Sequence, residues 1–91
     1  MELKRVVVTG LGTINPLGNN LSESWENLVK GVSGCDYITH FDASKFKTQF
    51  ACEVKNYDPN KFFDRKEARK IDLYTQYAII AATEAIEDAN F

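Results

Sequence analysis

Apolar residues recur at helical spacing in the segment after residue 20, which predicts an amphipathic helix over residues 21–30. Four side chains are spaced i, i+4, i+7 and i+8 on its apolar face, and we expect them to be buried: Leu21, Trp25, Leu28 and Val29. Asn20 and Glu23 have the spacing of a capping box at the helix start. Gly31 is expected to end the helix, because glycine readily adopts the left-handed conformation of a C′ residue.

Two other segments have the patterns of strands. Residues 5–9, RVVVT, form a continuous β-branched run, which is typical of a strand buried on both faces of a parallel sheet. Residues 48–55 alternate instead and predict a short, half-exposed strand. The apolar face of that strand would consist of Phe50, Cys52 and Val54. The intervening residues 32–47 show no period, and we expect them to form a loop.

The last third of the chain predicts one long helix. Asp64 and Glu67 have the spacing of a second capping box, and the helix would run from residue 64 to about residue 90. Its apolar residues lie almost all round the helix rather than along one stripe, which is typical of a helix inside a larger protein. Three aromatic residues at helical spacing are interpreted as core side chains: Trp25, Tyr74 and Tyr77.

These elements are an incomplete set for a fold. A strand buried on both faces and a helix that is apolar on all sides both need neighbours, and a parallel sheet needs further strands. We therefore expect residues 1–91 to be the N-terminal segment of a longer α/β protein.

The charge of the chain is unevenly distributed. Its net charge is −2, which predicts no general affinity for nucleic acid. Residues 61–70 hold five basic and two acidic groups, a local charge of +3, so the remainder carries −5. Lys66, Arg69 and Lys70 are spaced i, i+3 and i+4 and share one face of the predicted helix. They stand near its start, where the helix dipole is already positive, and this favours an anionic binding partner.

Composition excludes several classes of protein and site. Cys35 and Cys52 are too few for a disulfide framework or a zinc site, and each has an acidic neighbour rather than the basic one that activates a thiolate. His40 is the single histidine and has no partner at metal-ligand spacing, so a loop or hydrogen-bonding role is expected. No apolar run suits a signal peptide or a membrane span. We expect a cytoplasmic protein with no membrane attachment, no cofactor and no metal.

The glycines near the N-terminus invite comparison with a dinucleotide-binding loop. Gly10 and Gly12 are followed by Asn15 and Pro16, where the pattern G-x-G-x-x-G would require a third glycine at position 15. We therefore predict that Gly10, Gly12 and Gly18 are structural glycines of a tight turn between a strand and a helix.

Four motifs give the chain a family resemblance. The string RVVVTGLGTINPLGN, at residues 5–19, resembles the opening of the β-ketoacyl-[acyl-carrier-protein] synthases, the condensing enzymes of fatty-acid elongation. Three further features match in order: the Trp-bearing helix before Gly31, HFDAS at residues 40–44, and RKEARKID at residues 65–72. Together they cover the whole chain, and the last two are most similar to the type II synthases.

The resemblance implies a thiolase-like fold, in which a duplicated α/β half is built on a five-stranded sheet. It also implies decarboxylative condensation of malonyl carrier protein with an acyl-enzyme thioester, performed in a homodimer by one cysteine and two histidines. All three catalytic residues lie beyond residue 91 in the family. We therefore expect no catalytic residue in this chain and no condensing activity from it alone.

The resemblance also implies a role for Lys66, Arg69 and Lys70. In the family, basic residues at the matching positions contact the acidic helix of acyl carrier protein, a small helical bundle bearing a phosphopantetheine arm. Two alternatives are a free-standing module that binds an acidic partner through the basic helix end, and the first βα unit of a nucleotide-dependent enzyme. The all-round apolar helix argues against the first alternative, and Asn15 with Pro16 argues against the second.

Overall fold

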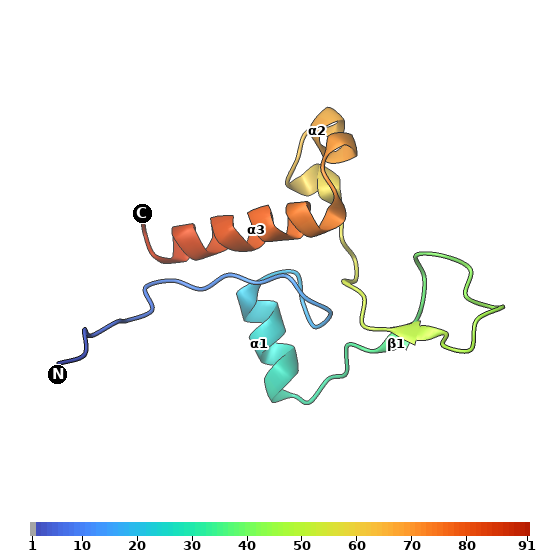
Figure 1. Ribbon diagram of the computed structural model, residues 1–91, viewed down its shortest axis with the longest axis horizontal. Helices are drawn as coiled ribbons and strands as arrows, with labels where there is room; N and C mark the ends of the chain where they lie inside the picture. Colours follow the sequence, from blue (N-terminus) through green and yellow to red (C-terminus); the bar gives the residue numbers. More distant parts are fainter. Residues whose placement is uncertain (1) are drawn as a thin grey trace.

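In the computed structural model, which describes residues 2–91, helices and one short antiparallel ribbon are joined by long irregular segments (Figure 1). The helices are α1 (Leu21–Val29), α2 (Arg65–Lys70) and α3 (Leu73–Asp88), with the 3₁₀ turn η1 (Pro59–Lys61) before α2. The strands of the ribbon are β1 (Asp36–Tyr37) and β2 (Phe50–Ala51).

The N-terminal segment runs alongside α3 in an extended conformation (Figure 1). Gly10 and Gly12 permit this close approach, because a Cβ on Gly12 would lie 2.6 Å from the amide nitrogen of Ala85 and a Cβ on Gly10 would collide with the Ala85 carbonyl. The Leu11 amide donates to Asp88 Oδ2 at 2.9 Å. The prediction that Gly10 and Gly12 form a tight turn is therefore wrong, because these two glycines allow close packing of an extended segment against α3.

A turn at residues 15–18 leads from this segment into α1. Asn15 and Gly18 exchange backbone hydrogen bonds of 2.9 and 3.1 Å. The Asn15 side-chain amide donates to Thr13 Oγ1 at 2.9 Å and to Ser24 Oγ at 3.0 Å, so it ties the turn to the first turn of α1. The position at which a dinucleotide-binding loop would need glycine thus holds a side chain with a structural function.

The start of α1 is supported by two acceptors. Asn20 Oδ1 accepts from the Glu23 amide at 2.8 Å, which confirms Asn20 as the N-cap. The Glu84 carboxylate, from α3, accepts from the Leu21 amide at 3.0 Å and from the Thr13 amide at 2.9 Å. This carboxylate also places a negative charge at the positive end of the α1 dipole. The arrangement joins α1, α3 and the N-terminal segment at one point.

α1 ends at Val29 with Lys30 as its C-cap, and Gly31, with φ of +73°, is the C′ residue that the sequence predicts. The predicted burial of its apolar face is wrong in the described chain, because Trp25 is 64% exposed. The other three apolar residues of that face are half-buried or exposed: Leu21, Leu28 and Val29.

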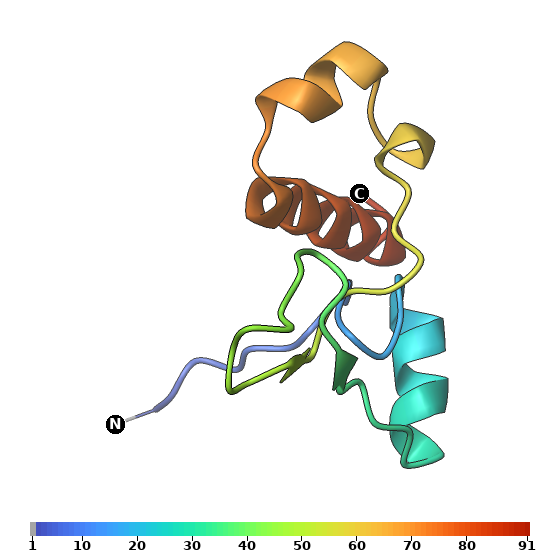
Figure 2. The ribbon, with the colours of Figure 1, turned by 90° about the vertical axis from the view of Figure 1, so that its right-hand side faces the viewer.

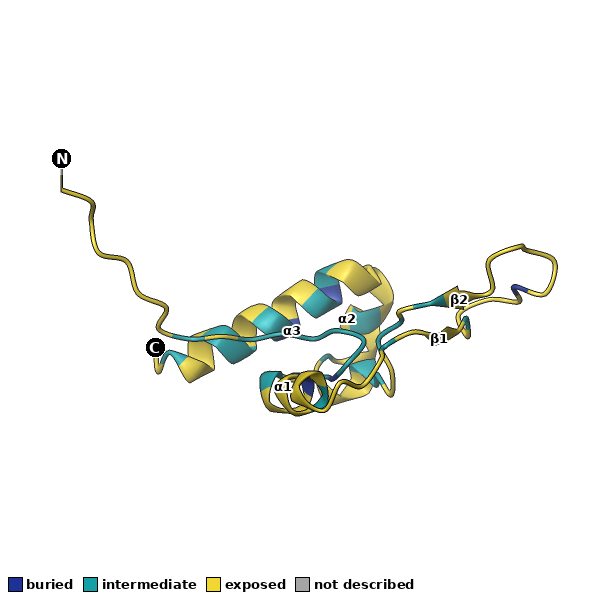
Figure 3. Cartoon of the chain, turned by 90° about the horizontal axis from the view of Figure 1, so that it is seen from below, coloured by how far each residue is buried: buried dark blue, intermediate teal, exposed yellow. Residues whose placement is uncertain are grey.

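Little of the chain is buried, as Figure 3 shows. Among the described residues, the buried apolar side chains are Ala43 and Ile80, while Tyr74 is 74% exposed, so it is not a core residue here. The radius of gyration is 16.6 Å, whereas a compact domain of this length would have about 12 Å. Most of the aromatic side chains lack a covering layer within the described part of the chain.

The expected strands are shortened or absent. Residues 5–9 are extended, but no described strand pairs with them, and Val6 is 87% exposed. A strand requires ladder hydrogen bonds, so this prediction is wrong for the described chain. The strand predicted at residues 48–55 is reduced to β2. Its partner β1 lies inside residues 32–47, which were expected to form a loop throughout.

The long helix predicted over residues 64–90 is interrupted. Ile71 is extended, with φ of −112° and ψ of 129°, and separates α2 from α3. Asp72 is the N-cap residue of α3. An aspartate directly before an apolar helical run is a start signal, and it marks the second helix in the sequence.

Gln76 explains the interruption. It is 3% exposed, and its Nε2 donates to the carbonyl oxygens of Ala68 and Ile71 at 3.0 and 2.9 Å. In a continuous helix these oxygens would accept from amides four residues later. The Gln76 side chain replaces those amides, which allows the backbone to turn between α2 and α3.

Candidate functional site

The basic residues singled out by the sequence lie together on α2, which stands apart from the rest of the molecule above α3 (Figure 2). Lys66, Arg69 and Lys70 are all exposed. The ion pairs within residues 2–91 lie elsewhere, between Lys30 and Glu26 and between His40 and Glu53. The three cations, which we call the α2 cluster, therefore have no carboxylate partner in the described chain.

The helix break changes the electrostatic interpretation of the α2 cluster. Because α2 ends at residue 70, Arg69 and Lys70 lie in its last turn, where a positive charge is favourable. Of the three, Lys66 alone is in the first turn, where it opposes the dipole. The prediction that the whole cluster stands at a helix N-terminus is therefore wrong. The candidate site rests on exposure, shared charge and the absence of paired acids among the described residues.

Polar and aromatic contacts beneath α2 hold it in place. The Tyr57 hydroxyl donates to Gln76 Oε1 at 2.5 Å, so the same amide that binds the end of α2 is itself fixed. Phe62 stacks on Tyr57 with ring centroids 6.2 Å apart, and Tyr77 meets Tyr57 edge-on at 5.1 Å. Burial, together with nearby Tyr77 and Asp58, raises the pKa of Tyr57 above its ordinary value. Tyr77 packs against Tyr57 but is half-buried, so it is not the core residue that the sequence predicts.

A shallow hollow at the start of α2 is lined by Asp64, Arg65, Lys66 and Arg69. It brings together two members of the α2 cluster and leaves Lys70 outside. Sequence reasoning missed Arg65, which lies off the i, i+3, i+4 face. The signal that could have identified it is the pair of adjacent basic residues at positions 65 and 66. The guanidinium groups of Arg65 and Arg69 and the ammonium group of Lys66 lie at one exposed surface. Such groups can bind the carboxylates or phosphates of an acidic partner.

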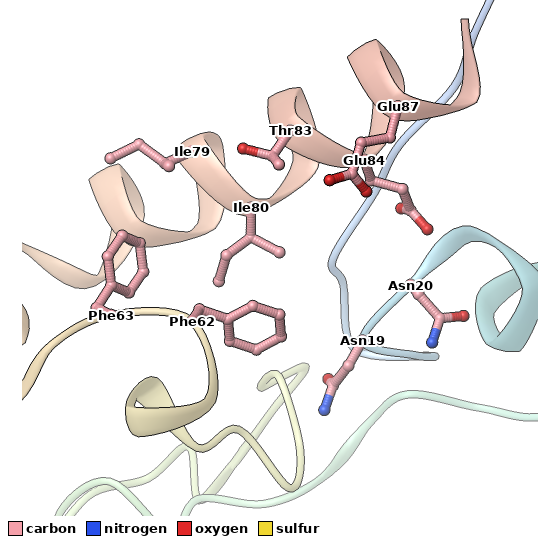
Figure 4. A pocket seen from close by; sticks show the side chains of 9 residues that line it. All are labelled: Asn19, Asn20, Phe62, Phe63, Ile79, Ile80, Thr83, Glu84 and Glu87. Atoms are coloured by element: carbon pink, nitrogen blue, oxygen red, sulfur yellow. The ribbon is translucent and has the colours of Figure 1, made fainter. Parts of the chain in front are cut away.

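A second concavity of about 330 Å³ lies between α3 and the segments before α1 and α2 (Figure 4). Phe62, Phe63, Ile79 and Ile80 form its apolar part, and asparagine and glutamate side chains form its polar part. Its Glu84 already accepts hydrogen bonds from backbone amides. The lining contains no cysteine, histidine or cation, so this concavity is not a site for the anionic groups that the α2 cluster could bind.

His40 lies in the loop between β1 and β2 beside Glu53. Its Nε2 is 3.6 Å from Glu53 Oε2, and its amide donates to the same oxygen at 3.3 Å. Partial burial opposes ionisation of Glu53, but hydrogen bonds from Thr39 and His40 outweigh it and hold the pKa of this carboxyl below its ordinary value. His40 thus has the loop position that the sequence predicts, and its hydrogen bond to Glu53 comes from the backbone amide rather than the imidazole.

The structure also describes the cysteines, the possible metal ligands and the apolar helices that the sequence analysis discusses. Within residues 2–91, no cluster of histidine, cysteine and acidic side chains could hold a metal ion. Cys35 and Cys52 are both exposed, and Cys52 follows the end of β2, so its predicted place on the apolar face of a strand is wrong. No described helix has the length and apolar character needed to cross a membrane.

Known proteins resemble the chain along nearly all of its length. The profile of the family "Beta-ketoacyl synthase, N-terminal domain" matches residues 3–91. Proteins named 3-oxoacyl-[acyl-carrier-protein] synthase 2 are similar: the one from Staphylococcus aureus (strain COL) is 49% identical over 87 residues, and the one from Coxiella burnetii is 49% identical over 90 residues. These alignments cover 96% and 99% of this chain but 21% and 22% of the relatives. The chain therefore spans about a fifth of their length.

A solved structure is also similar. "The ishigamide ketosynthase/chain length factor" superposes with a TM-score of 0.82 and 34% sequence identity, covering 93% of this chain and 21% of that one. The predicted fold class, an N-terminal portion of a thiolase-like α/β fold, is thereby confirmed.

Proposed function

This chain belongs to the β-ketoacyl synthase family, and we propose that it acts as the N-terminal segment of a type II 3-oxoacyl-[acyl-carrier-protein] synthase. The complete enzyme would elongate fatty acids in the cytoplasm, as a homodimer, by condensing malonyl carrier protein with an acyl-enzyme thioester. The names of the relatives support this activity. Residues 1–91, assigned to the N-terminal domain, would supply core elements and part of the carrier-docking surface. The catalytic cysteine and histidines would come from residues outside this segment.

The observation that carries the docking role is the exposed α2 cluster with no paired acid in the described chain. Acyl carrier protein is acidic, so a row of carboxylates on its helix would complement Lys66, Arg69 and Lys70. Each exposed ion pair is worth at most about 1 kcal/mol. Several such pairs also steer diffusional encounter, so the cluster would act on association more than on chemistry.

Charge reversal on the full-length synthase tests this role. We expect Lys66→Glu with Arg69→Glu to raise the KM for acyl carrier protein about tenfold, the equivalent of about 1.4 kcal/mol. The effect should be largest at low ionic strength, because salt screens exposed charges. Turnover of a small acyl-pantetheine substrate should barely change, since that substrate needs no docking surface.

Lys45→Glu with Lys47→Glu is the matched control. It makes the same change in net charge in the loop between β1 and β2, away from α2 (Figure 1). Its KM for the carrier should stay within about twofold of the wild-type value. If the α2 variant lost activity equally with both substrates, the α2 cluster would have a structural role. If its KM for the carrier were unchanged, the carrier would dock elsewhere.

A further inference from the structure

The register of the β1–β2 ribbon brings the two cysteines of the chain together. Asp36 stands opposite Ala51 in the antiparallel ladder. Continued by one residue beyond the end of each strand, this register places Cys35 opposite Cys52. These cysteines are seventeen positions apart in the sequence, but the register makes them neighbours at the open end of the ribbon. The strands β1 and β2 themselves lie side by side in Figure 3.

The hydrogen-bond pattern identifies the kind of pair they form. The Ile38 amide donates to the Gln49 carbonyl at 3.0 Å, so these two residues are a hydrogen-bonded pair. Pairs alternate along an antiparallel ladder, which makes Cys35 and Cys52 a pair without ladder hydrogen bonds. In such pairs the Cα atoms are about 4.5 Å apart and the side chains approach closely. That separation falls within the range of about 4.4–6.8 Å that a disulfide spans.

The two thiols already interact and can be reached from solvent. Partial burial, then the nearby Cys52 thiol, raises the pKa of the Cys35 thiol. Both residues are exposed and neither is in a disulfide. A small reagent therefore has access to either sulfur, and the second sulfur is adjacent once the first has reacted.

We propose that Cys35 and Cys52 form a modification site, a dithiol that a low-molecular-weight disulfide oxidises to a cross-strand disulfide. The thiolate of one cysteine attacks the reagent, forms a mixed disulfide and releases one thiol. The other cysteine then attacks the protein sulfur of that mixed disulfide and releases the second thiol. One S–S bond of the reagent is broken and one is formed in the protein. Two electrons pass from the cysteines to the reagent, whose two thiols carry away both protons.

The site has the character of a reversible switch rather than a structural crosslink. Exposed disulfides are typically labile, and reducing compartments return them to thiols. When formed, this bond would close the loop of residues 36–51, which carries His40. The raised pKa of Cys35 lowers its thiolate fraction at neutral pH, so we expect oxidation to proceed faster as the pH rises.

Peptide mapping of the full-length synthase tests the proposal. The protein is incubated with glutathione disulfide, alkylated, and digested with trypsin without reductant. Trypsin cuts after Lys45 and Lys47, between the two cysteines, so the disulfide would join peptide 31–45 to peptide 48–55. The expected product has a mass about 2 Da below the sum of the two thiol peptides, and it separates into them on reduction.

A shifted cysteine provides the matched control. Cys35→Ser with Asp36→Cys moves the thiol by one residue, to the opposite face of the ribbon. We expect at least tenfold less linked peptide from this variant under the same conditions. Equal linkage in the variant would overturn the proposal, because the ribbon register would not select the pair. Glutathione adducts without linkage, or linkage confined to covalent dimers on a non-reducing gel, would also overturn it.

Discussion

The starts of α1 and α2 have the same sequence pattern but different structures. Each has a polar N-cap residue followed three residues later by glutamate, Asn20 with Glu23 and Asp64 with Glu67. At α1 the Asn20 side chain accepts an amide hydrogen bond, and Glu84 from α3 accepts another. At α2 no side chain caps the helix, and its first turn holds Arg65 and Lys66 beside Glu67.

The difference shows how one pattern serves two purposes. At the start of α1, Asn20 and Glu84 accept hydrogen bonds from the backbone amides, so these side chains contribute to stability. The α2 start is exposed and its charges have no acid partner among the described residues, so its groups are available to another molecule. A capping box therefore predicts where a helix begins, whereas the neighbouring elements decide whether that end stabilises the fold or binds a partner.

Removal of the Glu84 side chain should have the largest effect on the difference between the two helix starts. Its carboxylate accepts hydrogen bonds from the Leu21 and Thr13 amides, and hydrogen bonds to a charged group contribute about 1.5–3 kcal/mol. We expect Glu84→Ala to lower the free energy of local unfolding of the α1 region by about 2 kcal/mol. Hydrogen exchange measured by mass spectrometry should show faster exchange over residues 13–25 of the full-length protein.

Glu87→Ala is the control for this effect. Glu87 is also on α3 and its side chain accepts no hydrogen bond within the described chain, but the substitution makes the same change in charge and helix propensity. We expect a change within about 0.5 kcal/mol. Equal effects of the two substitutions would mean that the Glu84 contacts do not stabilise α1.

The two N-caps provide a smaller test. Asn20→Ala removes a hydrogen bond of 2.8 Å to the Glu23 amide and should cost about 1 kcal/mol at the start of α1. Asp64→Ala removes no cap hydrogen bond at α2 and should cost less than about 0.5 kcal/mol. Exchange of the first-turn amides of each helix measures both effects. A larger loss at α2 than at α1 would contradict the contrast drawn between the helix starts.

The smallest expected effect concerns charge along α2. Lys66→Gln removes a cation from the first turn and should stabilise α2 by about 0.3 kcal/mol, whereas Lys70→Gln removes one from the last turn and should destabilise it by a similar amount. Amide exchange over residues 65–71 at low salt should show opposite signs. Effects of the same sign would indicate that the helix dipole does not govern the stability of this short helix.

Local signals in the sequence predicted a good part of this structure. The periodicity of α1, its Asn20 cap and its Gly31 stop all depend on residues close together in the chain, and all three are confirmed. The α2 cluster was also placed on one helix face, since i, i+3 and i+4 spacing requires only a single helical turn. Its role as a docking surface stays a prediction.

The features that the sequence did not predict depend on distant partners. The break after α2 is set by the Gln76 side chain, whose hydrogen bonds to Ala68 and Ile71 cannot be recognised from helical periodicity. Pairing of Cys35 with Cys52 depends on a ribbon register that two-residue strands do not reveal in their sequence. The burial expected for Val6 and Trp25 requires covering layers that the described residues do not supply.

The amide of Gln76 has a consequence for how this surface can evolve. This amide has a donor, Nε2, and an acceptor, Oε1, and both are already used. Nε2 donates to the backbone carbonyls of Ala68 and Ile71, and Oε1 accepts from the Tyr57 hydroxyl. The orientation of α2 is thus encoded by buried backbone contacts that involve none of the exposed basic side chains. Substitutions among Lys66, Arg69 and Lys70 can therefore retune the strength and selectivity of an interaction while the helix that displays them keeps its position.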